Sequence, residues 1–121
     1  MKLVLLVEDE ANQRLLYSQE LEDEGYEVDL AADGMEALEK LKARRPDVVV
    51  LDISMPNMDG IETLGNLLSR DNTIPVILHT AYSSYKDNFM TWSADAYVVK
   101  SSDLSELKER IRQALTESEG E

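Results

Sequence analysis

Near its N-terminus the chain reads Leu3-Val4-Leu5-Leu6-Val7-Glu8-Asp9-Glu10, in which five apolar residues are followed at once by three acidic ones. A continuous apolar run of this length is typical of a strand that is covered on both faces, as in a parallel sheet. Similar runs occur at residues 48–51, 76–78 and 97–99. Residues 26–30 instead alternate apolar and acidic side chains, which predicts a strand at an edge of the sheet with one face in water.

Segments with helical spacing separate these strands, and each indicates one apolar stripe. The stripes are Ala11 and Leu15; Ala37 and Leu41; Ile61, Leu64 and Leu68; and Leu104, Leu107, Ile111 and Leu115. A further short helix is expected over residues 82–92, where an aromatic stripe would pack on the sheet. This alternation of strands and helices predicts a doubly wound α/β domain with a five-stranded parallel sheet and five helices.

Local signals mark where several of these helices begin and end. Gly25 follows the first helix, and Asp33 opens the second together with Gly34. Two further helix starts resemble capping boxes, because an aspartate precedes a glutamate by three positions. These pairs are Asp59 with Glu62 and Asp103 with Glu106.

Length and composition describe a single domain. The 121 residues are 43% apolar, which is enough for one hydrophobic core. The net charge of −13 repels phosphate backbones and anionic lipids, so neither nucleic acid nor a membrane surface is an expected partner. The absence of cysteine excludes disulfides, thiolate zinc sites and iron–sulfur clusters. No run is long enough to span a membrane, and the acidic tail at residues 117–121 is expected to fray.

Polar residues follow most of the predicted strands, where an open α/β sheet places its ligand crevice. They are Glu8, Asp9 and Glu10 after the first run, Asp52, Thr80 and Lys100. Two carboxylates about 4 Å apart repel by roughly 4 kcal/mol at an effective dielectric of 20, so a hard cation is the natural occupant of such a cluster. Mg²⁺ fits, because it binds through one or two carboxylates together with waters and phosphate oxygens. Glu10 is instead interpreted as a helix cap.

Four motifs in this order resemble the receiver domain of two-component response regulators over essentially the whole chain. They are Val7-Glu8-Asp9; Leu51-Asp52 with residues 55–60 (Met-Pro-Asn-Met-Asp-Gly); Thr80-Ala81; and Tyr97-Val98-Val99-Lys100. The resemblance implies a flavodoxin-like sheet with strand order 2-1-3-4-5.

The same resemblance implies a role for each matching residue. Asp52 would be the phosphoacceptor, and Asp9 would bind Mg²⁺ directly with Glu8 as its acidic partner. Ser54 stands where the family supplies a metal ligand through its backbone carbonyl.

A second group of residues would act on the phosphoryl group. Thr80 resembles the hydroxyl that hydrogen-bonds it, and Lys100 the ammonium that ion-pairs with it. Tyr97 resembles the aromatic switch that turns inward when Thr80 moves. Phosphorylation would then change a face formed by the fourth helix, fifth strand and fifth helix, approximately residues 83–115.

The implied function is phosphorelay signalling in the cytoplasm. A sensor histidine kinase would donate the phosphoryl group, and the changed face would control a downstream protein or output domain. That face is also the candidate surface for a homodimer. Such a domain is a regulatory phosphoacceptor that assists only its own phosphorylation and dephosphorylation, and is not otherwise an enzyme.

The chain departs from the family pattern after Lys100, where Ser101 replaces a proline that is usually preceded by a cis peptide. A trans bond is expected, since a cis bond before a residue other than proline costs about 3 to 4 kcal/mol. Tyr82 occupies a position that tunes water access to the acyl phosphate, and its ring is expected to slow hydrolysis. His79, the single histidine, is interpreted as a structural residue at a strand end.

Three alternative functions would need different residues from those of a phosphoaccepting receiver. A flavodoxin-like nucleotide binder needs a phosphate cradle after the first strand, where this chain has three acids. An aspartyl phosphatase needs further catalytic groups, including a second acid two residues after Asp52. A degenerate receiver that serves as a phosphorylation-independent binding module remains the principal alternative, because the proline after Lys100 is missing.

Overall fold

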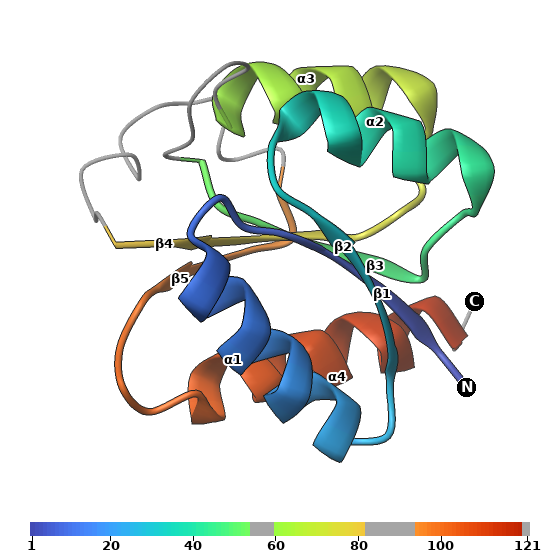
Figure 1. Ribbon diagram of the computed structural model, residues 1–121. Helices are drawn as coiled ribbons and strands as arrows, with labels where there is room; N and C mark the ends of the chain where they lie inside the picture. The colour runs from blue at the N-terminus through green and yellow to red at the C-terminus, as the bar shows by residue number, and fades with distance from the viewer. Residues whose placement is uncertain (54–59, 82–93, 120–121) are drawn as a thin grey trace.

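A computed structural model describes residues 1–53, 60–81 and 94–119 of the chain, and its centre is a five-stranded parallel sheet (Figure 1). The strands are β1 (Leu3–Val7), β2 (Glu27–Ala31), β3 (Val48–Leu51), β4 (Val76–Thr80) and β5 (Ala96–Val99). Their order is β2-β1-β3-β4-β5, and every neighbouring pair is parallel. The sequence prediction of fold class and strand order is therefore confirmed, with β2 at an edge as expected.

Helices cover both faces of this sheet. The described residues form four of them: α1 (Ala11–Asp23), α2 (Gly34–Ala43), α3 (Gly60–Arg70) and α4 (Ser105–Glu119). Helices α2 and α3 lie on one face, and α1 and α4 lie on the other (Figure 1). The fifth helix expected over residues 82–92 lies outside the described residues. None of the described helices is both long and apolar enough to cross a bilayer.

Alternate residues of each central strand point into two separate cores. Leu5, Val49 and Leu78 belong to the core beneath α2 and α3, together with Leu64 and Leu67 of α3. On the opposite face, the core beneath α1 and α4 contains Val4, Leu6, Tyr17, Leu21, Val48, Val50, Ile77, Val98, Leu107, Ile111, Ala114 and Leu115. Burial on both faces explains why the central strands are continuous apolar runs.

Most of the expected helix boundaries are present. Asp33 accepts a hydrogen bond from the Glu36 amide at the start of α2, and Gly25 follows α1 with a φ of 94°. Asp103 accepts from the Ser105 amide at 2.9 Å and so caps α4. The amide of Asp103 itself donates to Ser101 Oγ, so the reciprocal bond that defines a capping box with Glu106 is not formed. Asp59, the other expected capping residue, lies outside the described residues.

The sequence expectation about the buried face of α1 is wrong. The buried residues of α1 are Tyr17, Ser18 and Leu21, whereas Leu15 is 57% exposed. The stripe inferred from Ala11 and Leu15 therefore faces solvent. Helix α4 extends through Glu119, and the last two residues of the acidic tail lie outside the described residues.

A close backbone approach joins the end of β3 to the start of α3. The Gly60 amide donates to the Ile53 carbonyl oxygen at 3.1 Å. A β carbon on Gly60 would lie 1.8 Å from the Cα of Ile53, which is far inside van der Waals contact. Only glycine fits this position, and the approach anchors the backbone immediately after Asp52.

Candidate functional site

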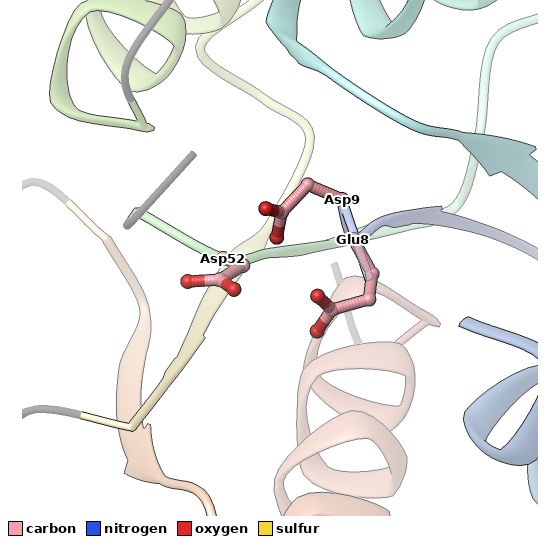
Figure 2. Close-up of side chains that lie close together, drawn as sticks. All are labelled: Glu8, Asp9 and Asp52. Atoms are coloured by element: carbon pink, nitrogen blue, oxygen red, sulfur yellow. The ribbon is translucent and has the colours of Figure 1, made fainter. Parts of the chain in front are cut away.

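Three carboxylates meet at the carboxyl edge of the sheet. Glu8 and Asp9 directly follow β1, and Asp52 directly follows the neighbouring strand β3. One carboxylate oxygen from each lies within 4.8 Å of the others, and Figure 2 shows the three side chains around a common space. Glu8 and Asp52 are buried, and Asp9 lies nearer to solvent. The sequence prediction that strand ends bring these acids together agrees with this geometry.

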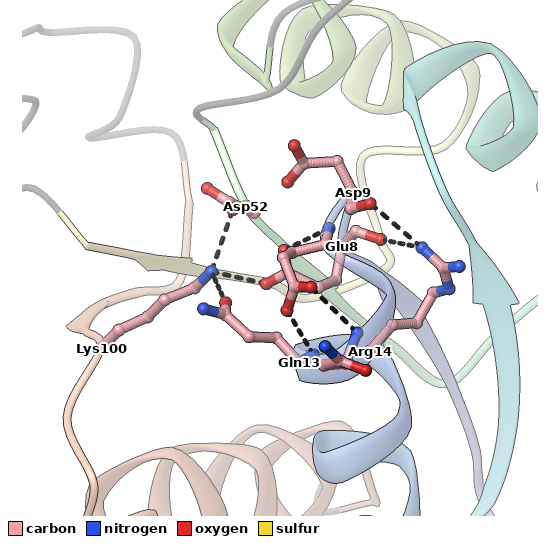
Figure 3. Close-up of polar contacts among 8 residues, drawn as sticks. Glu8, Asp9, Gln13, Arg14, Asp52 and Lys100 are labelled. Atoms are coloured by element: carbon pink, nitrogen blue, oxygen red, sulfur yellow. Dashed lines mark hydrogen bonds and ion pairs between the residues drawn. The ribbon is translucent and has the colours of Figure 1, made fainter.

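The ammonium of Lys100 enters the same cluster from the end of β5 (Figure 3). Its Nζ donates to Glu8 Oε1 at 2.5 Å, to Gln13 Oε1 at 2.7 Å and to Asp52 Oδ2 at 3.1 Å. The Lys100 side chain is only 12% exposed. A single cation thus faces two of the carboxylates at hydrogen-bond distance.

Burial and charge set the protonation of this group. Burial raises the pKa of the Glu8 carboxyl above its ordinary value, and the hydrogen bond from Lys100 offsets part of that rise. Burial also acts to lower the pKa of Lys100, but the hydrogen bond to Glu8 and the charge of Asp52 outweigh it, so the pKa of Lys100 is raised. Lys100 therefore remains a cation at neutral pH.

Backbone hydrogen bonds hold these residues in place beyond the formal strand ends. The Glu8 amide donates to Ala31 O at 3.0 Å and the Asp52 amide to Val7 O at 3.1 Å. The Lys100 amide donates to Thr80 O at 2.7 Å. Because each residue still belongs to the sheet ladder, its side chain is presented by a rigid element rather than by a free loop.

The turn from β1 into α1 is fixed by its own side chains. Glu10 caps α1 by accepting from the amides of Asn12 and Gln13, at 3.1 and 2.7 Å. Arg14 Nη1 donates to the carbonyl oxygens of Glu8 and Asp9, at 2.8 and 3.3 Å (Figure 3). Glu10 is therefore a helix cap, as the sequence indicates, and the two preceding acids are left to face the crevice.

The remaining residues that the sequence singles out differ in where they lie and in whether the structure describes them. Thr80 is fully buried at the end of β4. Tyr97 is partly buried and packs against the core beneath α2 and α3. Ser54, the expected source of a carbonyl ligand, and Tyr82 lie outside the described residues. His79 is 2% exposed and makes an edge-to-face contact with Tyr17, at 4.9 Å between ring centroids, in keeping with the structural role expected for it.

Sequence reasoning missed two residues of α1 that contact Lys100. Gln13 supplies the amide oxygen described above, and the Tyr17 ring centroid lies 5.8 Å from Lys100 Nζ. Gln13 and Tyr17 are four positions apart and so share one face of α1. This spacing is the signal that the sequence offers for the two residues, but the stripe predicted from Ala11 and Leu15 lies on a different face of the helix.

Ser101 makes local hydrogen bonds at the position where the family usually has proline. Its hydroxyl donates to Asp103 O at 2.8 Å and accepts from the Asp103 amide at 3.1 Å. No peptide bond among the described residues is cis, so the trans Lys100–Ser101 bond expected from the sequence is present. The trans bond does not prevent Lys100 from reaching Asp52.

The donor set matches a hard divalent cation. Three carboxylates opposed by one ammonium leave a net charge of −2 in the cluster, and oxygen is the donor that Mg²⁺ and Ca²⁺ prefer. The cluster is also open at Asp9, which leaves room for waters or phosphate oxygens on the ion. The residues present therefore fit Mg²⁺.

Comparison with known proteins agrees with the fold. The sequence model of the response regulator receiver domain matches residues 4–112. The response regulator ArlR of Staphylococcus saprophyticus is 38% identical over 117 residues, which are 95% of this chain and 53% of ArlR. The chain thus spans about half the length of the curated relatives that it matches.

Solved structures of similar sequence show the same architecture. The response regulator TrrA of Thermotoga maritima, crystallised with Mg²⁺ and BeF, is 45% identical; the match has a TM-score of 0.92 and covers 95% of this chain and 100% of TrrA. TrrA in complex with the histidine kinase ThkA matches with a TM-score of 0.89 and 45% identity, over 95% of this chain and 99% of TrrA. On its sequence, its fold and the acids at its strand ends, the chain belongs to the response regulator receiver domain family.

Proposed function

We propose that Asp52 accepts a phosphoryl group from a histidine kinase in a Mg²⁺-dependent reaction, and that this is the signalling step of the domain. The observation that carries the proposal is the position of the Asp52 carboxylate. It shares a cluster no wider than 4.8 Å with Glu8 and Asp9, and it accepts a hydrogen bond from Lys100 at 3.1 Å. A buried carboxylate between acids and a fixed cation is suited to act as a nucleophile toward phosphorus.

In the transfer step, an Asp52 oxygen attacks the phosphorus of the kinase phosphohistidine. A new oxygen–phosphorus bond forms, the nitrogen–phosphorus bond breaks, and the histidine leaves as imidazole after taking up a proton. Lys100 supplies positive charge to the phosphoryl oxygens, and the Thr80 hydroxyl donates a hydrogen bond to them. Hydrolysis of the acyl phosphate by water returns the Asp52 carboxylate and inorganic phosphate.

The metal would be held by Asp9 and Asp52, with Glu8 acting through a water and the Ser54 carbonyl as a further ligand. When bound, Mg²⁺ neutralises charge on the phosphoryl oxygens. The crystals of TrrA with Mg²⁺ and BeF support this assignment, since TrrA is 45% identical to the present chain.

The same proposal implies which protein donates the phosphoryl group and which surface changes after phosphorylation. The complex of TrrA with ThkA supports a histidine kinase as the donor. The added charge would draw Thr80 and Lys100 toward the phosphoryl group, turn Tyr97 inward and change the face expected over approximately residues 83–115. A downstream protein, an output domain or a second copy of the chain would recognise that face. The domain would act in the cytoplasm, where kinases have ATP, as a regulatory phosphoacceptor.

Intact-mass spectrometry tests the assignment. The protein is incubated with phosphoramidate, with and without Mg²⁺, beside the variants Asp52→Asn and Asp33→Asn. Asn keeps the α2 cap at position 33, so that variant is a matched control. A single added phosphoryl group is expected in the wild type and the control, only with Mg²⁺, and not in Asp52→Asn. No adduct in any sample would contradict the proposal and favour a phosphorylation-independent binding module.

A further inference from the structure

Helix α1 approaches the ammonium of Lys100 from the side opposite Asp52. Gln13 Oε1 accepts a hydrogen bond from Lys100 Nζ at 2.7 Å, and the Tyr17 ring lies one helical turn further along the same face. We propose that Gln13 is a positioning residue, whose amide oxygen holds Lys100 where the phosphoryl group on Asp52 needs it. The inference rests on the proposed function and adds a residue to it.

The need for such a residue arises from the flexibility of lysine. A free lysine side chain carries about 2 kcal/mol of rotamer entropy, so its head group must be fixed by contacts. An ammonium has three protons, and Lys100 places one on each of Glu8, Gln13 and Asp52. The Lys100 side chain is only 12% exposed, so loss of the Gln13 acceptor would leave a largely buried ammonium proton without a hydrogen-bond partner. The ammonium would then turn toward water and away from Asp52.

An amide suits this position better than a carboxylate. Lys100 already faces the negative charges of Glu8 and Asp52, and a third carboxylate would add to their mutual repulsion. A neutral oxygen directs the ammonium without neutralising it. The positive charge of Lys100 therefore stays available for the phosphoryl oxygens.

Gln13 is itself held by a closed series of hydrogen bonds. Its backbone amide donates to Glu10 Oε2 at 2.7 Å, and the Glu10 amide donates to Glu8 Oε2 at 3.1 Å. Glu8 and Gln13 then both accept from Lys100. These hydrogen bonds form one ring that joins the first turn of α1, the end of β1 and the end of β5 (Figure 3). The ring fixes Gln13 relative to the ammonium of Lys100.

The test compares variants that differ in the acceptor. Gln13→Met keeps a similar length and loses the oxygen, whereas Gln13→Glu keeps the oxygen. Gln113→Met makes the same change on α4, where the exposed side chain donates a hydrogen bond to Glu109. The first measurement is the rate at which the Lys100 ammonium protons exchange with water, by ¹⁵N NMR. The second is the rate of phosphorylation by phosphoramidate, with Mg²⁺ affinity and circular dichroism measured in parallel.

Gln13→Met is expected to speed exchange of the Lys100 protons and to slow phosphorylation, each by about tenfold, which corresponds to one hydrogen bond. Gln13→Glu should keep slow exchange, and Gln113→Met should match the wild type in both measurements. Unchanged exchange in Gln13→Met, or equally fast exchange in Gln13→Glu, would overturn the positioning role. If Gln13→Met does not fold, Gln13→Leu serves as the acceptor-free variant. The exchange measurement decides the inference even if Asp52 is never phosphorylated.

Discussion

The Nζ atom of Lys100 lies 3.1 Å from Oδ2 of Asp52, although the two residues are 48 positions apart and follow different strands. The contact places a cation at hydrogen-bond distance from the proposed phosphoacceptor. On phosphorylation, Lys100 would therefore exchange a carboxylate partner for phosphoryl oxygens without a long movement of its side chain.

Replacement of Lys100 by methionine is expected to destabilise the metal-free protein strongly. Removing one member of a buried ion pair leaves the other charges uncompensated, at a cost of about 3 kcal/mol. Mg²⁺ should recover part of this loss, because it supplies positive charge to the same carboxylates. Urea unfolding in EDTA and in Mg²⁺ checks both effects. Lys108→Met removes a more exposed ammonium that pairs with Glu20 and Glu24, and it should change little. Equal losses for the two variants would contradict the prediction.

Metal binding is expected to depend on Asp9 and not on its neighbour Glu10. Wild-type protein in Mg²⁺ at 100 times the dissociation constant should gain about 2.7 kcal/mol of stability over the metal-free form. Asp9→Asn should lose most of that gain, because an amide is a weaker ligand than a carboxylate. Glu10→Gln is the control, since Glu10 caps α1. Thermal unfolding across a Mg²⁺ titration measures the gain, and the same response in Asp9→Asn and wild type would refute the assignment.

His79 is expected to make the protein less stable as the pH is lowered below about 6.5. Burial, assisted by the nearby Lys100 ammonium, lowers the pKa of His79 to about 4, from an ordinary value of 6.5. Below pH 6.5 the unfolded chain therefore binds a proton that the folded chain excludes, so stability is present above pH 6.5 and is lost as the pH falls toward 4. Between pH 7 and pH 5 the loss should be about 2 kcal/mol.

The check on His79 is urea unfolding of wild type and His79→Leu at both pH values. Tyr17 and Lys100 lie beside position 79 and are present in both proteins, so their own titration cancels in the comparison. The leucine variant should lack this component of the pH dependence. A parallel loss of stability in the two proteins would show that other groups are responsible.

Gly60→Ala is expected to destabilise the fold more than Gly25→Ala. The added methyl group at position 60 would overlap the Ile53 backbone, so β3 and α3 must separate, at a cost of about 3 kcal/mol. Gly25 has open space around it, and its alanine variant has only the strain of a positive φ, about 1 kcal/mol. Chemical denaturation of both variants gives the comparison. A larger loss at Gly25 would contradict the close approach described at Gly60.

The strands and the acidic cluster could be predicted because each rests on a local rule. Apolar runs such as residues 3–7 can be satisfied only by burial on both faces, and the residue after a parallel strand has to lie at the carboxyl edge. Asp52 and Lys100 follow such runs directly. Strand order and the individual roles came from resemblance to a family rather than from these rules.

The parts that could not be predicted depend on tertiary contacts. Leu15 is more apolar than Ser18, yet Ser18 is buried and its hydroxyl donates to the Leu15 carbonyl oxygen. A buried serine whose hydroxyl is satisfied within its own helix has no apolar signature. Gln13 acquires its role only when the folded sheet brings Lys100, at the end of β5, to the first turn of α1, which no local pattern specifies.

The contact between Lys100 and Glu8 spans 92 positions of the chain, and β3 and β4 lie between the strands that carry its two ends. During synthesis, the carboxylates of Glu8, Asp9 and Asp52 leave the ribosome well before their cation does. Closing so long a loop costs entropy, and the contacts among the intervening strands must first compensate for it. The contact between Lys100 and Glu8 therefore forms only after the sheet is largely assembled. The charge-balanced centre of the domain is thus among the last features of a nascent chain to be completed, and a chain that stops before β5 holds its acids without their cation.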